Sequence, residues 1–259
     1  MKTTGIYLSG TGNTKHCMER LLSLVDRNAK AIPMESPEAV EALRSHDRIF
    51  LGYPTQFSDV PMMVKDFIRK NKKLWKGKHV ICIATMGAFS GDGAGCSARI
   101  LKKCGAIIDG GIHLRMPDSV CDHKALKKTD DENAAIIRKT DTRIEKIAQG
   151  ITNGKYPRNG LNIFSRIAGF CAQRLWWGKK TRTYSDELKI DSTKCIGCGT
   201  CANVCPMHNI KLSDGKPIPN AACTMCYRCI SLCPGKAITL LGKEVVEQCR
   251  FEKYQKKEI

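Results

Sequence analysis

Residues 195–206 read Cys195-Ile-Gly-Cys198-Gly-Thr-Cys201-Ala-Asn-Val-Cys205-Pro206. Residues 223–234 read Cys223-Thr-Met-Cys226-Tyr-Arg-Cys229-Ile-Ser-Leu-Cys233-Pro234, which is the same C-x2-C-x2-C-x3-C-P pattern 28 residues further along the chain. The similarity extends beyond the cysteines, because Ile210 and Ile238 each follow the last cysteine of their run by five residues. The repeat indicates an internal duplication, in which each half is a ligand loop followed by a short helix and a strand.

The spacing of each run has a chemical reason. Three thiolates separated by two residues each can ligate three irons of one 4Fe-4S cluster, while the cysteine before the proline ligates the other cluster. We therefore expect two 4Fe-4S clusters, the first held by Cys195, Cys198, Cys201 and Cys233. The second is assigned to Cys223, Cys226, Cys229 and Cys205. Zinc also binds paired C-x2-C motifs, but it leaves the third cysteine and the Cys-Pro of each run without a role.

With this pattern, residues 186–241 resemble a bacterial-type two-cluster ferredoxin. The predicted ligands account for eight of the 15 cysteines. The other seven lie in apolar or helical patterns or have no cysteine within ligand spacing, and we interpret them as small apolar side chains. They are Cys17, Cys82, Cys96, Cys104, Cys121, Cys171 and Cys249.

The whole chain has 259 residues, enough for two domains. Its formal charge is +18, and its hydrophobic content of 42% excludes wholesale disorder. The length and the odd cysteine count argue against a small secreted disulfide scaffold. The residues before Ser9 are too few for the apolar region of a signal peptide, and no apolar stretch is long enough to span a membrane. We therefore expect a protein of the reducing cytoplasm.

The first 150 residues follow a different pattern. Apolar runs of strand length alternate with segments of helical period, which predicts an α/β fold with a parallel sheet and helices on both faces. The predicted strands cover 5–8, 31–32, 48–53, 79–84 and 106–108, and the predicted helices cover 14–25, 37–44, 61–74, 94–104 and 130–149. Ligands of such sheets bind beyond the carboxyl ends of the strands.

The loop after the first predicted strand reads Ser9-Gly10-Thr11-Gly12-Asn13-Thr14. Its glycines let backbone N–H groups approach an anion, its hydroxyls can donate to phosphate oxygens, and a helix begins there, so it predicts a phosphate site. A Walker loop requires a Gly-Lys pair that is missing here. A dinucleotide fingerprint requires a glycine where Lys15 stands, although Glu35 suits that fingerprint. The hydroxyl-rich form resembles the phosphate loop of flavodoxins, which implies bound FMN and a doubly wound sheet of order 2-1-3-4-5.

Two later loops lie where flavodoxins place the loops on either side of the flavin ring. They are residues 52–59, after the third predicted strand, and residues 85–93, after the fourth. Backbone amides in these loops could reach the flavin, and Tyr53, Phe57 or Phe89 could stack on its ring or instead anchor the loops on the core. The flavin contacts that the resemblance implies are Pro54, Thr55, Gln56, Phe57, Met86, Gly87, Ala88, Phe89 and Gly91.

Taken together, the chain resembles the flavodoxin-ferredoxin fusion proteins of anaerobic bacteria. The resemblance implies a flavodoxin-like FMN-binding domain at residues 1–150 and a small α+β two-cluster ferredoxin domain at 186–241. A helical linker at 151–185 joins the two domains, and a charged C-terminal tail covers 242–259.

The linker concentrates positive charge, with eight basic and two acidic residues between positions 151 and 190. Apolar residues recur at helical spacing from Leu161 to Trp176, which predicts a basic amphipathic helix. We favour packing of its apolar stripe between the two domains. Peripheral contact of residues 161–180 with an anionic membrane surface is the alternative. No nucleic-acid-binding motif accompanies the charge, so we expect no nucleic-acid partner.

The predicted cofactors indicate an electron-transfer protein. FMN exchanges one or two electrons and a 4Fe-4S cluster exchanges one, so the chain would couple two-electron flavin chemistry to one-electron steps and serve a redox partner protein. A flavin-dependent reductase of a quinone or other small acceptor, fed through the ferredoxin domain, is the alternative. A binding protein with purely structural cofactors is a third. No Ser/His/Asp or paired-carboxylate constellation indicates a hydrolase, and the sequence identifies no catalytic residue.

Overall fold

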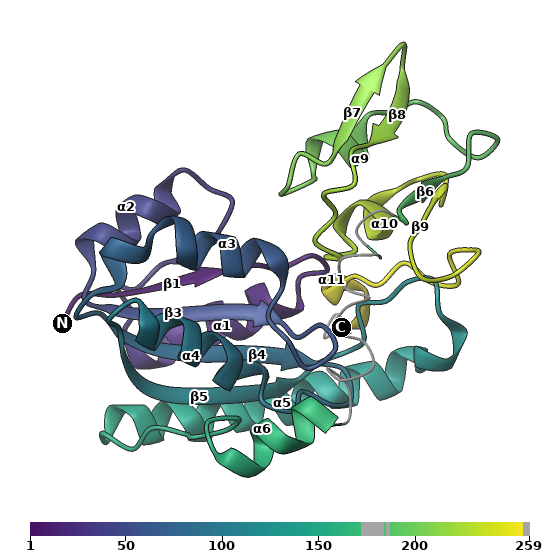
Figure 1. The fold of residues 1–259 in the computed structure, drawn as a ribbon. Helices are drawn as coiled ribbons and strands as arrows, with labels where there is room; N and C mark the ends of the chain where they lie inside the picture. The colour runs from purple at the N-terminus through teal and green to yellow at the C-terminus, as the bar shows by residue number, and fades with distance from the viewer. Residues whose placement is uncertain (172–183, 185–186, 256–259) are drawn as a thin grey trace.

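The computed structural model describes residues 1–171, 184 and 187–255 (Figure 1). Its first part is built on a parallel five-stranded sheet of order β2-β1-β3-β4-β5, which confirms the predicted doubly wound topology. The strands are β1 (Thr3–Tyr7), β2 (Ala31–Pro33), β3 (Arg48–Pro54), β4 (His79–Met86) and β5 (Ile107–Arg115). The central strands β3 and β4 are buried along almost their whole length, as expected for a sheet covered on both faces.

Helices cover both faces of this sheet (Figure 1). One face carries α2 (Glu38–Ser45), α3 (Met62–Lys70) with the 3-10 turn η1 (Lys72–Trp75), and α4 (Gly93–Lys103). The other face carries α1 (Asn13–Val25) and α5 (Asp130–Thr152). A short 3-10 turn, η2 (Lys124–Leu126), precedes α5, which starts in a capping box formed by Thr129 and Glu132.

The fifth strand is much longer than the predicted segment 106–108. Its centre contains Gly110 and Gly111, which carry no side chain and weaken the apolar pattern of the sequence. Residues 157–159 lie against these glycines, because the Gly111 N–H donates to the Pro157 carbonyl (2.8 Å) and the Asn159 N–H donates to the Gly111 carbonyl (2.8 Å). A methyl group at Gly111 would fall 2.4 Å from the Asn159 carbonyl oxygen. The glycines therefore seat the start of the linker along the edge of the sheet.

The linker helix is placed differently from the expectation. Helix α6 (Ile163–Gly169) begins at Asn162, whose side chain accepts from the Ser165 N–H at 2.7 Å. Its apolar side chains are exposed rather than packed between domains, since residues 157–161 hold the helix beside β5 and away from the cysteine-rich part (Figure 1). The exposed residues are Ile163 (57%), Phe164 (79%), Ile167 (54%) and Phe170 (52%). Leu161, at the start of the predicted stripe, packs against the core of the first domain, and Leu175 and Trp176 lie outside the described residues.

The C-terminal part is built from two small antiparallel pairs and two short helices. Strand β6 (Lys189–Ile190) pairs with β9 (Ile238–Thr239), and β7 (Ile210–Ser213) pairs with β8 (Lys216–Pro219). Helices α9 (Thr200–Asn203) and α10 (Arg228–Leu232) lie within the two cysteine runs, and each contains the third cysteine of its run. Ile210 and Ile238, the equivalent residues of the repeat, each begin a strand and are both buried in the core of this part.

The end of the chain is packed, in contrast to the predicted tail. Helix α11 (Phe251–Tyr254) lies against α1 and α5, with Phe251 and Tyr254 buried in the core. The Phe251 ring stacks on His16 with a centroid distance of 4.2 Å. These contacts bring the last described residues back onto the first domain. In the part of the chain that the structure describes, no helix has the length and apolar character needed to cross a membrane.

Candidate functional site

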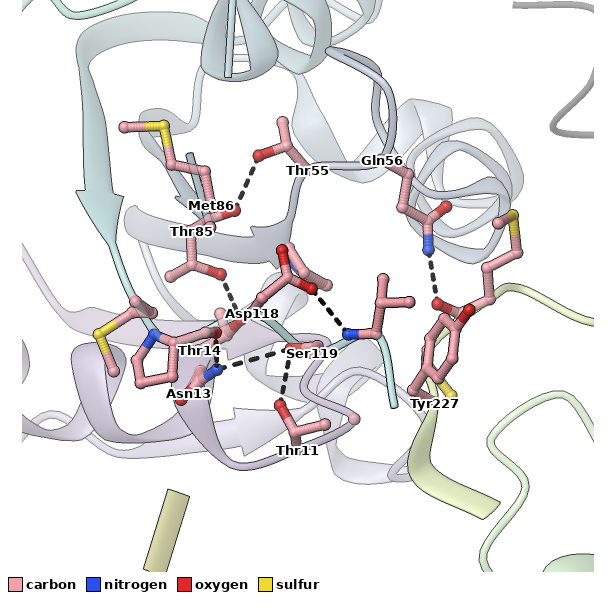
Figure 2. Close-up of a pocket in the computed structure, with 18 of the residues that line it drawn as sticks. Thr11, Asn13, Thr14, Thr55, Gln56, Thr85, Met86, Asp118, Ser119 and Tyr227 are labelled. Atoms are coloured by element: carbon pink, nitrogen blue, oxygen red, sulfur yellow. Dashed lines mark hydrogen bonds between the residues drawn. The ribbon is translucent and has the colours of Figure 1, made fainter. Parts of the chain in front are cut away.

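A cavity of about 300 Å³ opens at the carboxyl ends of the parallel strands (Figure 2). Four loops of the first domain line it, and residues 225–227 of the cysteine-rich part close one side. Most of the predicted flavin-contacting residues meet here. They are Ser9, Gly10, Thr11, Asn13, Thr14, Pro54, Thr55, Gln56, Phe57, Met86, Gly87, Ala88 and Phe89.

The loop at residues 9–14 has the form expected of a phosphate site. Gly12 has a φ of 93°, and the turn that it makes lets α1 begin at Asn13 with its first N–H groups free of intrahelical partners. Ser9 Oγ is buried in the cavity wall and has no hydrogen-bond partner among the described residues. Since a buried hydroxyl without a partner is costly, a phosphate oxygen at this loop would satisfy it. The loop therefore fits the FMN phosphate.

Three of the predicted residues are placed away from the cavity. Gly12 lies on the opposite side of the loop, where it borders Phe251. Gly91 packs against Gly169 and Ser58, so it supports the loop and does not line the cavity. Tyr53 is fully buried, and its hydroxyl hydrogen-bonds to Ser97 Oγ (2.6 Å), so it is a core residue.

Phe57 and Phe89 differ from Tyr53, because both line the cavity. The Phe57 ring also lies 6.0 Å from that of Tyr184 in a stacked arrangement. Phe89 is 44% exposed at the mouth of the cavity. The loop aromatics therefore remain the candidates for stacking on a flavin ring.

The loop after β5 is a part of the site that the sequence analysis missed. Residues 116–120 line the cavity and are tied to the phosphate loop, since Asn13 Nδ2 donates to the Pro117 carbonyl at 2.8 Å and Thr11 Oγ1 lies 2.8 Å from Ser119 Oγ. Figure 2 shows Asp118 between Thr14 on one side and Gln56 on the other. Burial raises the pKa of the Asp118 carboxyl above its ordinary value of 3.8. The rule for parallel sheets points to this loop too, but the predicted strand ended seven residues early.

Two smaller cavities in the cysteine-rich part each collect one predicted ligand set. The distal cluster cavity, as we call it, is lined by Cys195, Cys198, Cys201 and Cys233. The proximal cluster cavity is lined by Cys205, Cys223, Cys226 and Cys229. In each case three cysteines come from one run and the fourth from the other, which is the grouping that the spacing predicts. Within the described residues, no three or more His, Cys, Asp or Glu side chains are arranged to hold a single metal ion.

The protonation behaviour of the thiols suits iron ligation. Burial raises the pKa of Cys223 to about 12 and also raises the pKa of Cys226 and of Cys229. Such thiols become thiolates only beside a strong positive charge, which the irons of a cluster supply. At the distal cavity, hydrogen bonding to Thr200 lowers the pKa of the exposed Cys198. The four-sulfur donor sets therefore fit two iron-sulfur clusters.

The proximal cluster cavity adjoins the cavity at the carboxyl ends of the parallel strands, which we call the flavin cavity. Cys226 and Tyr227 line both of them. Gln56 Nε2 donates to the Thr224 carbonyl at 2.6 Å and to the Met225 carbonyl at 3.1 Å, which ties the second cysteine loop to the loop after β3 (Figure 2). The joint between the two parts of the chain is thus built from cofactor-binding loops on both sides.

Asp122 stabilises this joint by accepting hydrogen bonds from the cysteine-rich part. Its Oδ1 accepts from the Tyr227 hydroxyl at 3.0 Å, and its Oδ2 accepts from the N–H groups of Leu240, Leu241 and Gly242 at 2.6, 2.9 and 3.1 Å. Tyr227 has a φ of 62°, a conformation that costs a non-glycine residue about 1–3 kcal/mol. The Asp122 carboxylate therefore helps to keep Tyr227 between the two cavities.

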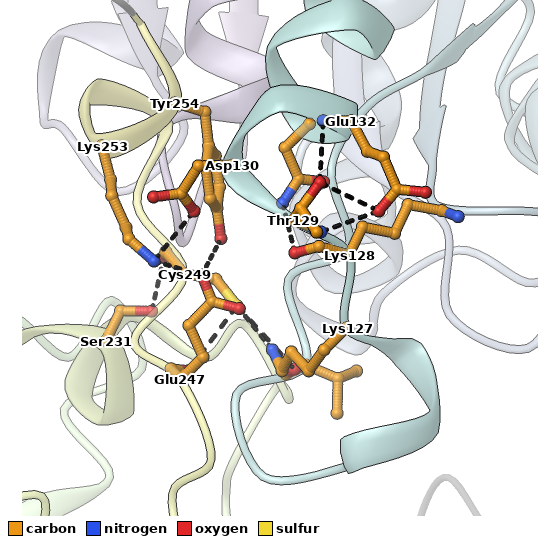
Figure 3. A network of polar contacts seen from close by, with 12 residues as sticks. Lys127, Lys128, Thr129, Asp130, Glu132, Ser231, Glu247, Cys249, Lys253 and Tyr254 are labelled. Carbon is orange, nitrogen blue, oxygen red and sulfur yellow. Dashed lines mark hydrogen bonds and ion pairs between the residues drawn. The ribbon is translucent and has the colours of Figure 1, made fainter.

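A second polar network, which we call the C-terminal clasp, fastens the end of the chain (Figure 3). Lys253 Nζ bridges Asp130 Oδ1 (3.1 Å) and Glu247 Oε1 (2.5 Å). Lys127 Nζ donates to Cys249 Sγ at 2.8 Å. A hydrogen bond from the Cys121 thiol, together with the Lys127 amine, lowers the pKa of Cys249 to about 7. Cys121 and Cys249 are far apart in the sequence and show no common spacing pattern, so the sequence analysis interpreted both as ordinary apolar side chains.

Comparisons with known proteins agree with these sites. Residues 6–103 match the family described as Flavodoxin domain, and residues 188–211 and 220–239 match two families described as 4Fe-4S binding domain. The chain carries a flavodoxin domain followed by two 4Fe-4S binding domains. These matches assign FMN to the flavodoxin domain and two 4Fe-4S clusters to the ferredoxin part.

Individual relatives cover one domain at a time. Ferredoxin-2 of Desulfomicrobium norvegicum is 53% identical over 30 residues, which are 12% of this chain and 51% of that protein, so the chain spans about half the length of this curated relative. The structure of the two-electron reduced flavodoxin of Megasphaera elsdenii is 26% identical, with a TM-score of 0.41 over 45% of this chain and 88% of the other. A mutant flavodoxin of Pseudomonas aeruginosa is 14% identical, with a TM-score of 0.44 over 60% of this chain and 98% of the other.

Proposed function

We propose that the protein relays electrons within one chain, between FMN in the flavodoxin domain and the two 4Fe-4S clusters. The observation that carries the proposal is the wall shared by the flavin cavity and the proximal cluster cavity, which Cys226 and Tyr227 form. Two redox cofactors that are separated by one layer of side chains can exchange electrons without a diffusing carrier. The flavodoxin and ferredoxin matches support electron transfer as the general role.

The residues of the chain have separate tasks in this relay. Bound FMN supplies a centre that exchanges one or two electrons, and each cluster supplies a one-electron centre. Ser9 and the first N–H groups of α1 hold the phosphate, while Gln56 fixes the loop after β3 against the proximal cysteine loop. Cys229, which is buried in the wall of the proximal cavity, helps to keep water away from the joint.

The distal cavity is the expected contact point for a one-electron partner protein. Its ligand set includes the exposed Cys198, whereas each of the four proximal cysteines is half-buried or buried. Ile196, beside the distal cavity, is 69% exposed. We therefore place the order of centres as flavin, proximal cluster, distal cluster, partner.

The test compares reduction of the flavin in the purified, anaerobic holoprotein and in two cysteine variants, with a reduced two-cluster ferredoxin as the electron donor. Cys223→Ser removes a predicted proximal ligand, and Cys104→Ser changes a cysteine outside both cavities and serves as the control. We expect equal FMN content in all three proteins and flavin reduction at least about tenfold slower in Cys223→Ser, a change of about 1.4 kcal/mol in barrier. Equal rates in all three proteins would contradict the relay.

A further inference from the structure

Arg228 makes the most extensive polar contacts between the phosphate loop and the proximal cysteine loops. Its Nη2 donates to the Ser9 carbonyl at 2.7 Å and pairs with Glu35 Oε1 at 2.6 Å, and its Nη1 donates to the Val204 carbonyl at 3.2 Å. The side chains of Arg228 and Glu35 are only 19% and 22% exposed. The planar fork of a guanidinium can serve three acceptors at fixed angles, and an ammonium group on a flexible stem cannot reproduce this arrangement.

The three contacts join the phosphate loop and the segment after β2 to the two ligand loops of the proximal cavity. Ser9 belongs to the phosphate loop, and Glu35 follows β2. Val204 directly precedes the predicted ligand Cys205, and Arg228 itself directly precedes the predicted ligand Cys229. One side chain thus connects both ligand loops of the proximal cavity to the flavodoxin domain.

The pair also places two opposite charges beside the proximal cavity. Reduction of a cluster adds one negative charge, so a nearby positive charge favours the reduced state and a nearby negative charge opposes it. The partial burial of both side chains limits screening by solvent. Arg228 lies between the predicted proximal ligands Cys226 and Cys229 in the chain, and its guanidinium bonds to the residue before Cys205. Arg228 and Glu35 should therefore shift the proximal potential in opposite directions and leave the distal potential unchanged.

We infer that Arg228 is a positioning residue which, balanced by Glu35, fixes the proximal cysteine loops on the phosphate loop and sets the reduction potential of the proximal cluster. The inference rests on the cluster assignment in the proposed function, but it does not require that electrons pass between the flavin and the cluster. The charges of Arg228 and Glu35 would give the two clusters different reduction potentials, although the cysteine spacing of the two runs is identical.

The test measures the midpoint potential of each cluster by anaerobic reductive titration followed by electron paramagnetic resonance, on the full chain with both clusters and FMN. The variants are Arg228→Met, Arg228→Lys and Glu35→Gln. We expect Arg228→Met to make reduction of the proximal cluster about tenfold less favourable, a shift of about 59 mV for a one-electron couple. Glu35→Gln is expected to make it more favourable by a similar factor. Arg228→Lys should leave it within about twofold, because the potential depends on the charge, which is kept, and not on the fork of the guanidinium, which is lost.

The distal cluster is the internal control and should keep its potential in all three variants. A purely structural ion pair predicts a different result, because Arg228→Met and Glu35→Gln both break the same contact and would shift the proximal potential in the same direction. That result, or the absence of any shift, overturns the inference. If Arg228→Met does not assemble its clusters, Glu35→Gln and Arg228→Lys decide together, because a structural ion pair predicts a shift in both variants and the electrostatic role predicts a shift in Glu35→Gln alone. Opposite shifts together with no electron exchange between flavin and cluster would support the inference and contradict the relay.

Discussion

Gly10 of the phosphate loop lies directly against the carbonyl group of Cys226. A methyl group added at Gly10 would fall 1.6 Å from the Cys226 carbonyl oxygen and 2.7 Å from its carbonyl carbon. Backbone atoms cannot move aside as a flexible side chain can, so a residue with a side chain would force the two loops apart. The glycine that lets the phosphate loop approach an anion therefore also lets the flavodoxin domain approach the proximal cluster.

The first prediction concerns this contact. Gly10→Ala is expected to lower the free energy of unfolding by about 1–3 kcal/mol, as overpacking of a tight contact does. The same change should slow electron exchange between flavin and clusters, because it widens the gap between them. Anaerobic urea unfolding and rapid-kinetic absorbance measurements check the two effects. A Gly10→Ala protein with the stability and kinetics of the parent would show that this contact neither stabilises the fold nor sets the gap between flavin and clusters.

The second prediction concerns the buried hydroxyl of Ser9. Ser9→Ala should weaken FMN binding by about 1.5–3 kcal/mol, the range for a hydrogen bond to a charged group. The FMN-free protein should be as stable as the parent or more stable, because the variant removes a buried polar atom without a partner. Titration of the FMN-free protein with FMN measures the affinity, with Ser23→Ala on an exposed helical turn as the control. Unchanged FMN affinity would place the phosphate elsewhere.

The third prediction concerns the pH dependence that Asp118 imposes. Burial raises the pKa of this carboxyl above 3.8, so the native chain keeps the proton over a range of pH in which the unfolded chain has lost it. The stability linked to Asp118 is therefore full below pH 3.8 and is lost as pH rises through the native pKa. Asp118→Asn should thus be more stable than the parent at neutral pH, with a difference that shrinks toward low pH.

Anaerobic urea unfolding of both proteins across this range gives the difference at each pH. Asp26→Asn, a change in a half-buried residue at the C-cap of α1, is the matched control. A stability difference that does not vary with pH would mean that the pKa of the Asp118 carboxyl is the same in the native and unfolded chains.

The fourth prediction compares the hydrogen bonds of Asp122 with the C-terminal clasp. Asp122→Ala leaves three N–H groups and the Tyr227 hydroxyl without their acceptor, and it should destabilise the protein by about 3 kcal/mol or more. Lys253→Met removes the bridge of the C-terminal clasp, but Lys253 is 39% exposed, so the loss should stay below about 1 kcal/mol. Unfolding curves of the two variants give both values. Equal losses would contradict this ranking of the two networks.

The sequence predicts those parts of the structure that local patterns determine. The cysteine repeat and the loop at residues 9–14 depend on spacing and on short runs of residues, and the strand order follows from the resemblance to flavodoxins that this loop carries. The exposed face of α6 was not predictable, because its position depends on how residues 157–161 fit against Gly110 and Gly111. The contribution of Asp118 to the cavity was missed for a related reason, since those glycines also obscured the end of β5.

The joint itself depends on contacts between residues far apart in the chain. Arg228 and Ser9 are separated by 219 positions, and Asp122 and Tyr227 by 105. Neither contact leaves a periodic or spacing signal in the sequence. The sequence therefore predicts both sets of cofactor ligands, and the structure adds which cluster lies next to the flavin.

The most direct test of the relay is the kinetic order of electron exchange after a flash of photochemical reductant. The anaerobic holoprotein is reduced by a small fraction of one electron per chain, and the approach of flavin and cluster absorbance to equilibrium is recorded at several protein concentrations. We predict one rate constant that does not change with protein concentration and that is lost in Cys223→Ser. A rate that rises in proportion to protein concentration would show that electrons pass between molecules, and it would contradict a relay within one chain.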